Sequence, residues 1–209
     1  MPTAFMGTPE FAVPALDATH AKTDLQLVVT QPDRPAGRGR KLKPPAVKVR
    51  ALELGLEVVQ PEASVSKVLG ERLEALELDA IVVAAYGKIL GRRVLRAPRL
   101  GCVNLHASLL PRQRGASPPV WAILSGDAET GVSIQQMVLE MDAGDVLASR
   151  STPIDPNETS GELLSRLSVI GGELMSEFLP KLAVGDVVPA EQDAAAATFA
   201  RPLNKADGV

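Results

Sequence analysis

The amino-acid sequence predicts an α/β fold built on a mainly parallel sheet with helices on both faces. Short apolar runs, typical of buried strands, alternate with segments whose apolar residues recur at helical spacing. Strands that alternate with helices in this way form βαβ units, in which the strands run parallel and helices cover the sheet. The expected strands span residues 3–8, 25–30, 56–60, 79–85 and 101–107, and the expected helices span residues 9–20, 46–55 and 64–78.

The pattern changes after residue 107, where an antiparallel extension of the sheet is expected. Two consecutive apolar segments, 131–137 and 145–154, are predicted to be neighbouring antiparallel strands. A short helix is expected near 120–125. A longer helix is expected at 159–180, where capping residues precede leucines at helical spacing.

Length and composition indicate a globular protein with one sizeable core. The chain has 209 residues, of which 45% are hydrophobic and 22% charged. Periodicity ends near residue 188, so we expect one domain over 1–188 and a linker or tail over 189–209. No segment approaches the roughly 18 apolar residues of a membrane span, and no signal peptide is evident. Cys102 is the only cysteine, so we expect a cytoplasmic protein without a disulfide, a metal or a membrane partner.

Positive charge is concentrated in residues 31–50. This stretch carries seven Lys and Arg residues against one acid, Asp33, which makes +6, so a net charge of −3 leaves −9 for the rest of the chain. A basic cluster on an acidic protein favours an anionic partner. A solvated surface loop explains the composition equally well.

The first strand is not followed by a dinucleotide fingerprint. MGTPEF has one glycine and a proline where G-x-G-x-x-G would be required, and the GxxxxGK[ST] phosphate loop is also absent. The sequence thus predicts a Rossmann-like sheet without a nucleotide cofactor.

GCVNLHASLLPRQRG, residues 101–115, contains one of only two histidines. Side chains two apart on a strand share a face, so Asn104 and His106 point together at the carboxyl end of a predicted parallel strand. DAGD adds Asp142 and Asp145 in an expected turn, and a carboxylate there could orient the imidazole. An amide, an imidazole and a carboxylate together can stabilise an oxyanion and move a proton, as acyl transfer requires. The sequence has no G-x-S-x-G nucleophile motif, which favours direct transfer over a covalent acyl-enzyme. A buried structural histidine and an ordinary turn remain alternatives.

Two stretches of the chain resemble the formyltransferases that use 10-formyltetrahydrofolate. They are NLHASLLPRQRGASP and, after it, GDAETGVSIQQMVLEMDAGDVL. The shared marks are N-x-H, S-L-L-P and the later D-x-G. Three stretches further upstream are similar to the branch of this family that formylates methionyl-initiator tRNA for translation initiation. They are FMGTPEFAVPAL, VVTQPDRPAGRGRKLKPPAVK and VVAAYGKIL. The resemblance covers roughly residues 3–188 and implies the Rossmann-like formyltransferase fold.

By this resemblance, Asn104, His106 and Asp142 form the catalytic set, and Asp145 is the less direct of the two aspartates. The amine attacks the formyl carbon on the folate, Asn104 and protonated His106 stabilise the negative oxygen, and Asp142 pairs with His106 and helps remove the amine proton.

The resemblance also implies a folate site formed by the AAYGKIL segment, the S-L-L-P stretch and Asp142. An ordinary strand-to-helix turn is the alternative for AAYGKIL, and a core position is the alternative for the S-L-L-P leucines. The residues assigned to folate are Ala85, Tyr86, Gly87, Ile89, Leu90, Ser108, Leu109, Leu110, Pro111 and Asp142.

The basic stretch 31–50 corresponds, by resemblance, to an insertion that contacts the acceptor arm of the tRNA. Its expected contacts are with phosphates, which position the RNA without reading its sequence. Arg112 and Arg114 lie near the site and could also approach RNA, or could be solvated. The residues assigned to tRNA are Arg34, Arg38, Arg40, Lys41 and Lys43.

Two departures from the family pattern qualify these expectations. Gln113 stands where the family often has an aromatic residue, which puts a stacking role there in doubt. Full-length members carry a C-terminal β-barrel that also binds tRNA, whereas this chain ends at Val209. We therefore expect a monomeric catalytic domain with a missing C-terminal partner, an intact folate site and weakened transfer to tRNA. The alternatives are a related formyltransferase or hydrolase that acts on a small amine or on formyl-folate, and a folate- or RNA-binding fragment with little turnover.

Overall fold

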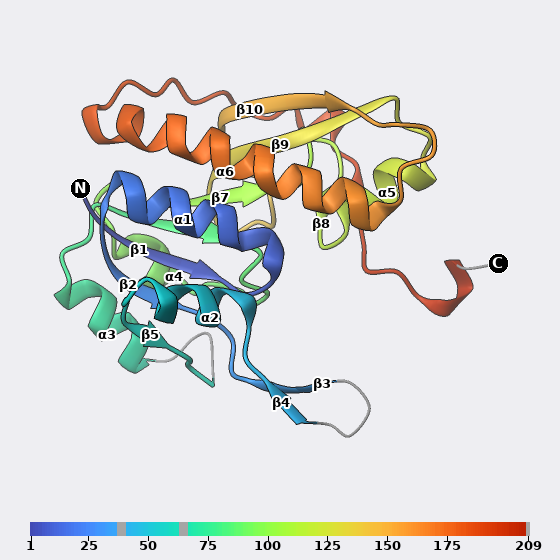
Figure 1. Ribbon diagram of the computed structural model, residues 1–209. Coiled ribbons are helices and arrows are strands. Elements are labelled where there is room, and N and C mark those ends of the chain that lie inside the picture. Colours follow the sequence, from blue (N-terminus) through green and yellow to red (C-terminus); the bar gives the residue numbers. More distant parts are fainter. Residues whose placement is uncertain (37–40, 63–66, 208–209) are drawn as a thin grey trace.

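A seven-stranded sheet forms the centre of the protein in the computed structural model, which describes residues 1–36, 41–62 and 67–207 (Figure 1). The strands lie in the order β10-β9-β7-β6-β1-β2-β5. Five neighbours, from β5 to β7, pair in parallel, whereas β9 and β10 pair antiparallel, which confirms the predicted fold class. Their bounds are β1 Pro2–Gly7, β2 Asp24–Val29, β5 Val58–Val59, β6 Ala80–Ala84, β7 Cys102–His106, β9 Glu129–Gln136 and β10 Val146–Pro153.

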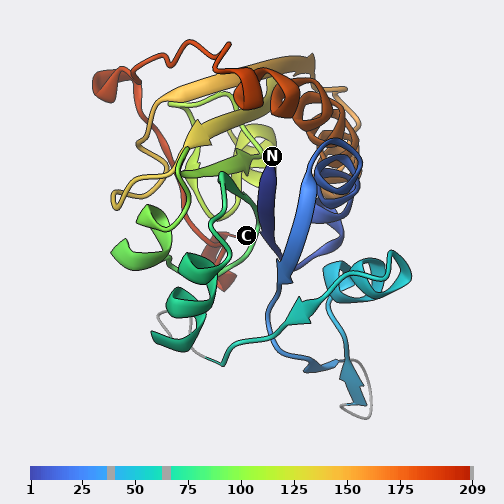
Figure 2. The same ribbon diagram turned by 90° about the vertical axis from the view of Figure 1, so that its left-hand side faces the viewer.

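Helices cover both faces of this sheet. The helices α1 and α6 pack side by side on one face, with α2 beside α1, and α3 and α4 cover the other face (Figure 2). The bounds are α1 Val13–Lys22, α2 Ala46–Glu53, α3 Lys67–Ala75, α4 Arg92–Arg96, α5 Pro118–Leu124 and α6 Ser160–Val184. Short 3-10 turns are η1 Glu10–Ala12, η2 Ala194–Ala196 and η3 Lys205–Asp207.

The pleat of the strands divides the core into two apolar clusters. On β1, Phe5 packs toward α1 and α6, whereas Met6 packs toward α3 and α4. On β7, Leu105 belongs to the first cluster and Cys102 to the second. Because side chains alternate along a strand, this pattern places residues 104 and 106 on the α3/α4 face.

Several elements differ from the prediction, including one strand and two helices. The strand expected at 56–60 is only two residues long, α4 was not predicted, and α6 continues beyond Pro180. A proline usually ends a helix. Here the last turn of α6 buries Leu182 against the core, and Gly185, with φ 74°, closes the helix with an N–H bond to the Leu182 carbonyl.

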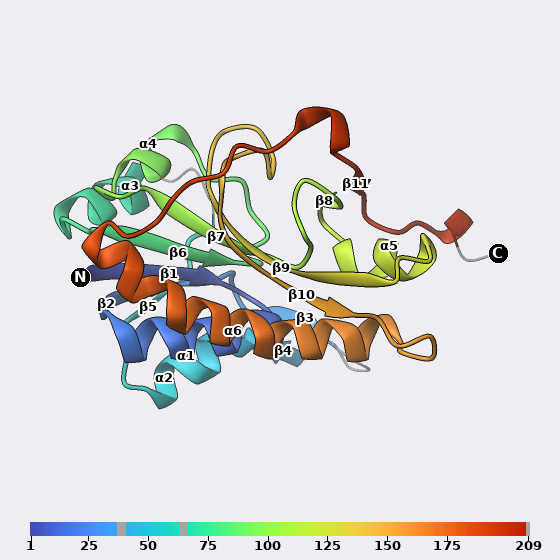
Figure 3. The ribbon, with the colours of Figure 1, turned by 90° about the horizontal axis from the view of Figure 1, so that it is seen from above.

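The segment after α6 returns across the protein (Figure 3). Its strand β11 (Phe199–Ala200) pairs in parallel with β8 (Arg114–Gly115), in the loop that follows β7. The Val146 and Ala190 backbones also exchange two hydrogen bonds of 2.8 Å. The sequence showed no periodicity here because this contact depends on backbone pairing with a distant loop. The division into residues 1–188 and 189–209 stays a prediction.

The packing of α1 against α6 yields a stability prediction. A Cβ on Gly172 would lie 2.6 Å from the Pro14 Cβ and 3.0 Å from the Pro14 carbonyl oxygen, whereas a Cβ on Gly161 would meet nothing within 4 Å. We expect Gly172→Ala to lower the free energy of unfolding by about 1–3 kcal/mol through overpacking. Gly161→Ala should leave it unchanged or raise it by up to about 1 kcal/mol. Urea unfolding followed by circular dichroism measures both, and equal effects would contradict the close approach.

The burial of β7 yields a second prediction. Cys102 is fully buried, its thiol donates to the Val94 carbonyl at 3.6 Å, and burial raises the pKa of the thiol to about 12. Because the thiolate is the reactive form, we expect iodoacetamide at pH 8 to label the folded protein at least about 10³-fold more slowly than the urea-unfolded chain. Mass spectrometry measures both rates. Rapid labelling of the folded protein would show that β7 is accessible.

Candidate active site

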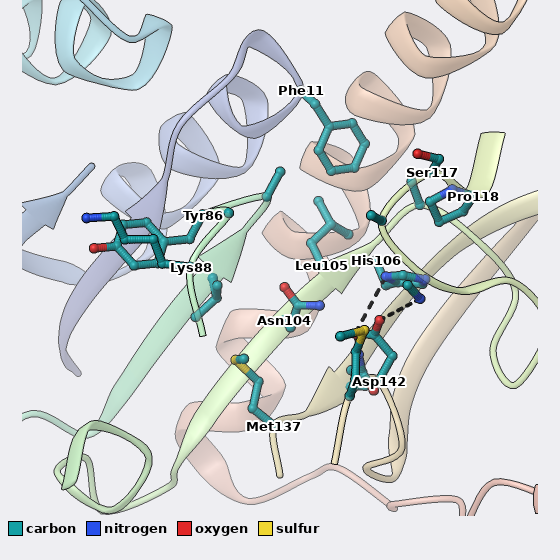
Figure 4. Close-up of a pocket in the computed structure, with 18 of the residues that line it drawn as sticks. Phe11, Tyr86, Lys88, Asn104, Leu105, His106, Ser117, Pro118, Met137 and Asp142 are labelled. Atoms are coloured by element: carbon teal, nitrogen blue, oxygen red, sulfur yellow. Dashed lines mark hydrogen bonds and ion pairs between the residues drawn. The ribbon is translucent and has the colours of Figure 1, made fainter. Parts of the chain in front are cut away.

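A cleft of about 790 Å³ opens at the carboxyl ends of β6 and β7 (Figure 4). Open α/β sheets place ligands at this edge. Three segments supply most of its wall: residues 85–90 after β6, residues 115–120 after β8, and residues 137–142 after β9. Asn104, His106 and Asp142 all line it, so the structure brings the predicted catalytic set together.

Asn104 and His106 point to the same side of β7 and into the cleft (Figure 4). The His106 side chain is 7% exposed, and its Nε2 lies 2.9 Å from the Gln113 carbonyl oxygen. Because a carbonyl only accepts, Nε2 carries the hydrogen of this bond. In the part of the chain that the structure describes, no hydrogen bond engages the Asn104 side chain, which leaves its amide available to a ligand.

Asp142 is held beside the imidazole by two donors. The Gly115 N–H donates to its Oδ2 and the Gln135 side-chain amide donates to its Oδ1, each at 2.8 Å. Oδ1 lies 3.8 Å from Nδ1 of His106, the ring nitrogen that does not face Gln113. The Asp142 side chain is 14% exposed, whereas Asp145 is exposed and lies outside the cleft. The structure thus separates the two aspartates of the DAGD turn.

The backbone is strained at the site. Ala85, Gln113 and Asp142 have φ angles of 45°, 57° and 51°, a region that side chains other than glycine rarely adopt. Each costs about 1–3 kcal/mol and persists only where surrounding contacts enforce it. Gln113 contacts His106, Asp142 belongs to the predicted catalytic set, and Ala85 begins the cleft wall after β6.

The AAYGKIL segment lines the cleft, with Ala85, Tyr86, Gly87, Ile89 and Leu90 all in its wall, and their assignment to folate stays a prediction. The Tyr86 carbonyl accepts hydrogen bonds from Thr8 at 2.9 Å and Gln31 at 2.8 Å, which fixes the turn. Burial raises the pKa of the Tyr86 hydroxyl, which has no partner among the described residues.

The S-L-L-P stretch is not part of the cleft wall. Ser108 donates to the Arg112 carbonyl at 2.7 Å and Ser133 donates to the Ser108 carbonyl at 2.7 Å, while the Leu110 N–H donates to Ser133 at 3.1 Å. Ser108, Leu109, Leu110 and Pro111 are not among the residues that line the cleft, and their assignment to folate stays a prediction. These residues instead fasten the loop after β7 to β9, because the polar groups of Ser108 and Ser133 are satisfied internally.

The sequence analysis did not predict the roles that three glutamines play at the site. Gln135 faces Asn104 in the strand register and bonds Asp142. Gln113 acts through its backbone carbonyl, so its side-chain type carried no signal. Gln192 reaches the turn at Asp142 from the returning chain. Of the three, only Gln135 gave a signal in the sequence, because it is a polar residue that alternates with apolar residues on a predicted strand.

The cleft also has an apolar wall that the sequence analysis did not assign. Phe11, Met137 and Pro118 contribute to it. Further members are exposed apolar side chains of the segment after β9, which are Val138, Leu139 and Met141.

The basic stretch forms an antiparallel hairpin of β3 (Arg34–Ala36) and β4 (Lys41–Lys43), which projects from the sheet (Figure 1). Lys41 and Lys43 are exposed and have no ion pair among the described residues. Arg34 is exposed and bonds the Gln31 side chain. Arg38 and Arg40 lie outside the described residues.

The other basic residues of 31–50 have internal partners. Lys48 pairs with Asp33 at 2.8 Å, and Arg50 pairs with Asp17 at 2.8 Å. Asp33 also accepts from Gln60, and these bonds lower the pKa of its carboxyl. Near the site, Arg112 pairs with Asp127 at 2.5 Å, and Arg114 is buried. Arg114 is therefore not available to RNA at the surface.

No helix in the described ranges is long and apolar enough to cross a membrane. Within the same ranges, no group of three His, Cys, Asp or Glu residues is arranged to hold a metal ion.

Comparison with known sequences identifies the family. Residues 2–179 match the family model described as formyl transferase. The chain is 51% identical over 209 residues to methionyl-tRNA formyltransferase of Anaeromyxobacter sp. (strain K), covering 100% of this chain and 67% of that protein. It is 49% identical over 208 residues to the same enzyme of Sorangium cellulosum (strain So ce56), again covering 100% of this chain and 67% of the relative.

Solved structures share the fold. Glycinamide ribonucleotide transformylase 1 from Symbiobacterium toebii superposes with a TM-score of 0.75 at 19% identity, covering 92% of this chain and 94% of that structure. The N-formyltransferase from Helicobacter canadensis, in complex with folinic acid and dTDP-3-aminofucose, superposes with a TM-score of 0.74 at 18% identity, covering 97% and 72%. The sheet, its helices and the sequence match over residues 2–179 agree, and the chain belongs to the formyl transferase family.

Proposed function

We propose that this protein transfers the formyl group of 10-formyltetrahydrofolate to the α-amine of methionyl-initiator tRNA. The observation that carries the proposal is the 49–51% identity to methionyl-tRNA formyltransferases along the whole chain. The chain spans about two thirds of the length of these relatives, 67% in both cases. The grouping of Asn104, His106 and Asp142 in one cleft supports the same reaction.

The cleft fits a folate. Its apolar walls suit a flat heteroaromatic ring, whose polar edge needs hydrogen-bonding partners. The backbone groups of Gly87, Ile89 and Leu90 make no hydrogen bond with the described residues, and neither do those of residues 138–141 on the facing segment. Two stretches of unpaired backbone beside an apolar cleft are therefore available to read the edge of a pterin.

Formyl transfer requires one bond to form and one to break. The amine nitrogen bonds to the formyl carbon, the bond from that carbon to N10 of the folate breaks, the amine loses one proton and N10 gains one. Negative charge develops on the formyl oxygen during the attack. A site for this reaction needs donors at the oxygen and a group that moves protons.

The three side chains supply these functions. The free amide of Asn104 donates to the formyl oxygen, and His106, when protonated, offers a second donor through Nδ1. The bond from Nε2 to Gln113 fixes the ring, and Nδ1, which lies 3.8 Å from Asp142 and makes no hydrogen bond with the described residues, is free to donate to the formyl oxygen. Asp142, fixed by Gly115 and Gln135, balances the imidazolium charge and accepts the proton released by the amine.

The hairpin supports a nucleic-acid acceptor. Arg34, Lys41 and Lys43 are exposed on a ribbon that projects from the sheet, as the phosphate contacts of an RNA require. Gln31, at its base, bonds both Arg34 and the Tyr86 carbonyl in the cleft wall. The cationic ribbon is thus continuous with the folate side of the site.

A small-amine acceptor is the competing function, since glycinamide ribonucleotide and amino-sugar formyltransferases share the fold. Single-turnover transfer from 10-formyltetrahydrofolate to methionyl-tRNA and to small amines tests the choice. We expect the tRNA to be formylated at least tenfold faster. Faster transfer to a small amine would overturn the assignment of the acceptor.

The role of Asp142 predicts the effect of Asp142→Asn. This change keeps the size of the side chain but removes the charge beside His106 and the proton acceptor, so we expect kcat to fall by about 10²- to 10⁴-fold. Asp145→Asn, in the same turn but outside the cleft, is the matched control and should keep the kcat of the parent protein. Equal losses in both variants would refute a specific role for Asp142.

The hairpin predicts a salt-dependent contribution to tRNA binding. Replacing Lys41 and Lys43 together by alanine should weaken tRNA binding about tenfold near 0.1 M salt and reduce the salt slope of log Kd by about 2. A control variant with Lys22→Ala and Lys181→Ala removes the same charge elsewhere. Lys22 lies just before the amino end of β2, whereas the hairpin follows the carboxyl end of that strand. An unchanged salt slope in the hairpin variant would exclude phosphate contacts there.

A further inference from the structure

The returning chain, residues 190–201, contacts the catalytic loops at several points. The Thr198 hydroxyl accepts the Gln113 N–H at 2.8 Å, and the Thr198 carbonyl accepts the Arg114 N–H at 2.8 Å. The Ala200 carbonyl accepts the Ala116 N–H at 2.8 Å. A Cβ on Gly115 would lie 2.8 Å from that carbonyl, so the close approach requires glycine there. The returning chain therefore fixes the loop that carries the partner carbonyl of His106 and the N–H donor of Asp142.

Gln192 uses both ends of its side-chain amide in this contact. Its oxygen accepts from the Arg114 guanidinium, at 3.1 Å from Nε and 2.8 Å from Nη2. Its Nε2 donates to the carbonyls of Asp142 at 2.9 Å and Gly144 at 2.6 Å. One side chain thus ties the loop after β7 to the turn that contains Asp142.

The backbone conformation of Asp142 depends on the hydrogen bond from Gln192. Its φ of 51° is unfavourable for an aspartate unless contacts on both sides of the residue enforce it. Gly115 and Gln135 hold the carboxylate, and Gln192 holds the backbone carbonyl. Without Gln192, the peptide after Asp142 is free to rotate toward a more favourable φ, which moves the carboxylate relative to His106.

We propose that Gln192 is a positioning residue for formyl transfer, which sets the Asp142 carboxylate against the His106 imidazole through the Asp142 backbone. This inference rests on the proposed function for its kinetic consequence, and on the contacts alone for its structural consequence. Gln192 touches none of the reacting atoms. It acts by setting the geometry of the Asp142 carboxylate, which does take part in the reaction.

The kinetic test compares Gln192→Ala and Gln192→Glu with Glu191→Ala, an exposed neighbour that serves as the matched control. A displaced catalytic group costs up to about 10²-fold, so we expect both Gln192 variants to lower kcat by about 10- to 100-fold, with the KM for the formyl donor within about twofold of the parent value. Glu191→Ala should change neither. Gln192→Glu keeps an acceptor for Arg114 and loses the donors to Asp142 and Gly144. A normal kcat in Gln192→Glu would overturn the proposal, even if Gln192→Ala failed to fold.

A double-mutant cycle with Asp142→Asn separates positioning from general destabilisation. If Gln192 acts through Asp142, adding Gln192→Ala to Asp142→Asn should lower kcat by less than about twofold. Losses that multiply would assign Gln192 a merely structural role.

A measurement without turnover distinguishes failure of this inference from failure of the proposed function. The chain has only two histidines, so NMR of the imidazole rings resolves His106 with His20 as an internal reference. We expect Gln192→Glu to shift the ring resonances of His106 and leave those of His20 unchanged. Unchanged His106 resonances would overturn the positioning role, whatever the activity. A shifted His106 in a protein that formylates neither tRNA nor small amines would support the positioning role and refute the proposed function.

Discussion

The site depends on the way in which the Asp142 carboxylate is held. Its two oxygens accept from the Gly115 backbone and the Gln135 side chain, and one oxygen faces His106. These groups come from β7, β8, β9 and the turn after β9, so the carboxylate joins four segments that are distant in the sequence. A nearly buried charge is stable only when it has such partners. The sheet and the loops must therefore fold correctly around this one group before the cleft can act on a substrate.

Backbone strain lies mainly at the carboxyl ends of the strands, whereas the apolar core stabilises the fold. The core is conventional, with two apolar clusters on opposite faces and α1 packed tightly against α6 through Gly172. Of the four non-glycine residues with positive φ in the described ranges, Ala85 and Asp142 line the cleft and Gln113 bonds His106 there, whereas Glu77 lies outside it. The cost of holding polar groups in these conformations is offset by burial elsewhere, which is the usual relation between a rigid scaffold and a functional site.

The basic stretch illustrates how tertiary structure sorts charges that composition treats as equal. Lys48 and Arg50 are engaged by carboxylates, so they contribute to stability and carry little net field. Lys41 and Lys43 project on the hairpin without partners in the described ranges. Free cations on a projecting ribbon attract an RNA backbone. The paired Lys48 instead bonds Asp33, next to the start of the ribbon. The proposed acceptor therefore depends on geometry as much as on charge.

The sequence by itself determined the fold class, the approximate strands and most helices, because apolar periodicity reflects which faces are buried. It also determined that Asn104 and His106 share a face, because strand geometry has a period of two. The choice of Asp142 over Asp145 followed from the family resemblance, and the structure places Asp142 beside His106. Only the tertiary structure decided that the S-L-L-P stretch is fastened to β9 and that Gln192 reaches the turn at Asp142. These contacts join residues up to 50 positions apart in the sequence, and such contacts leave no periodic pattern in the chain.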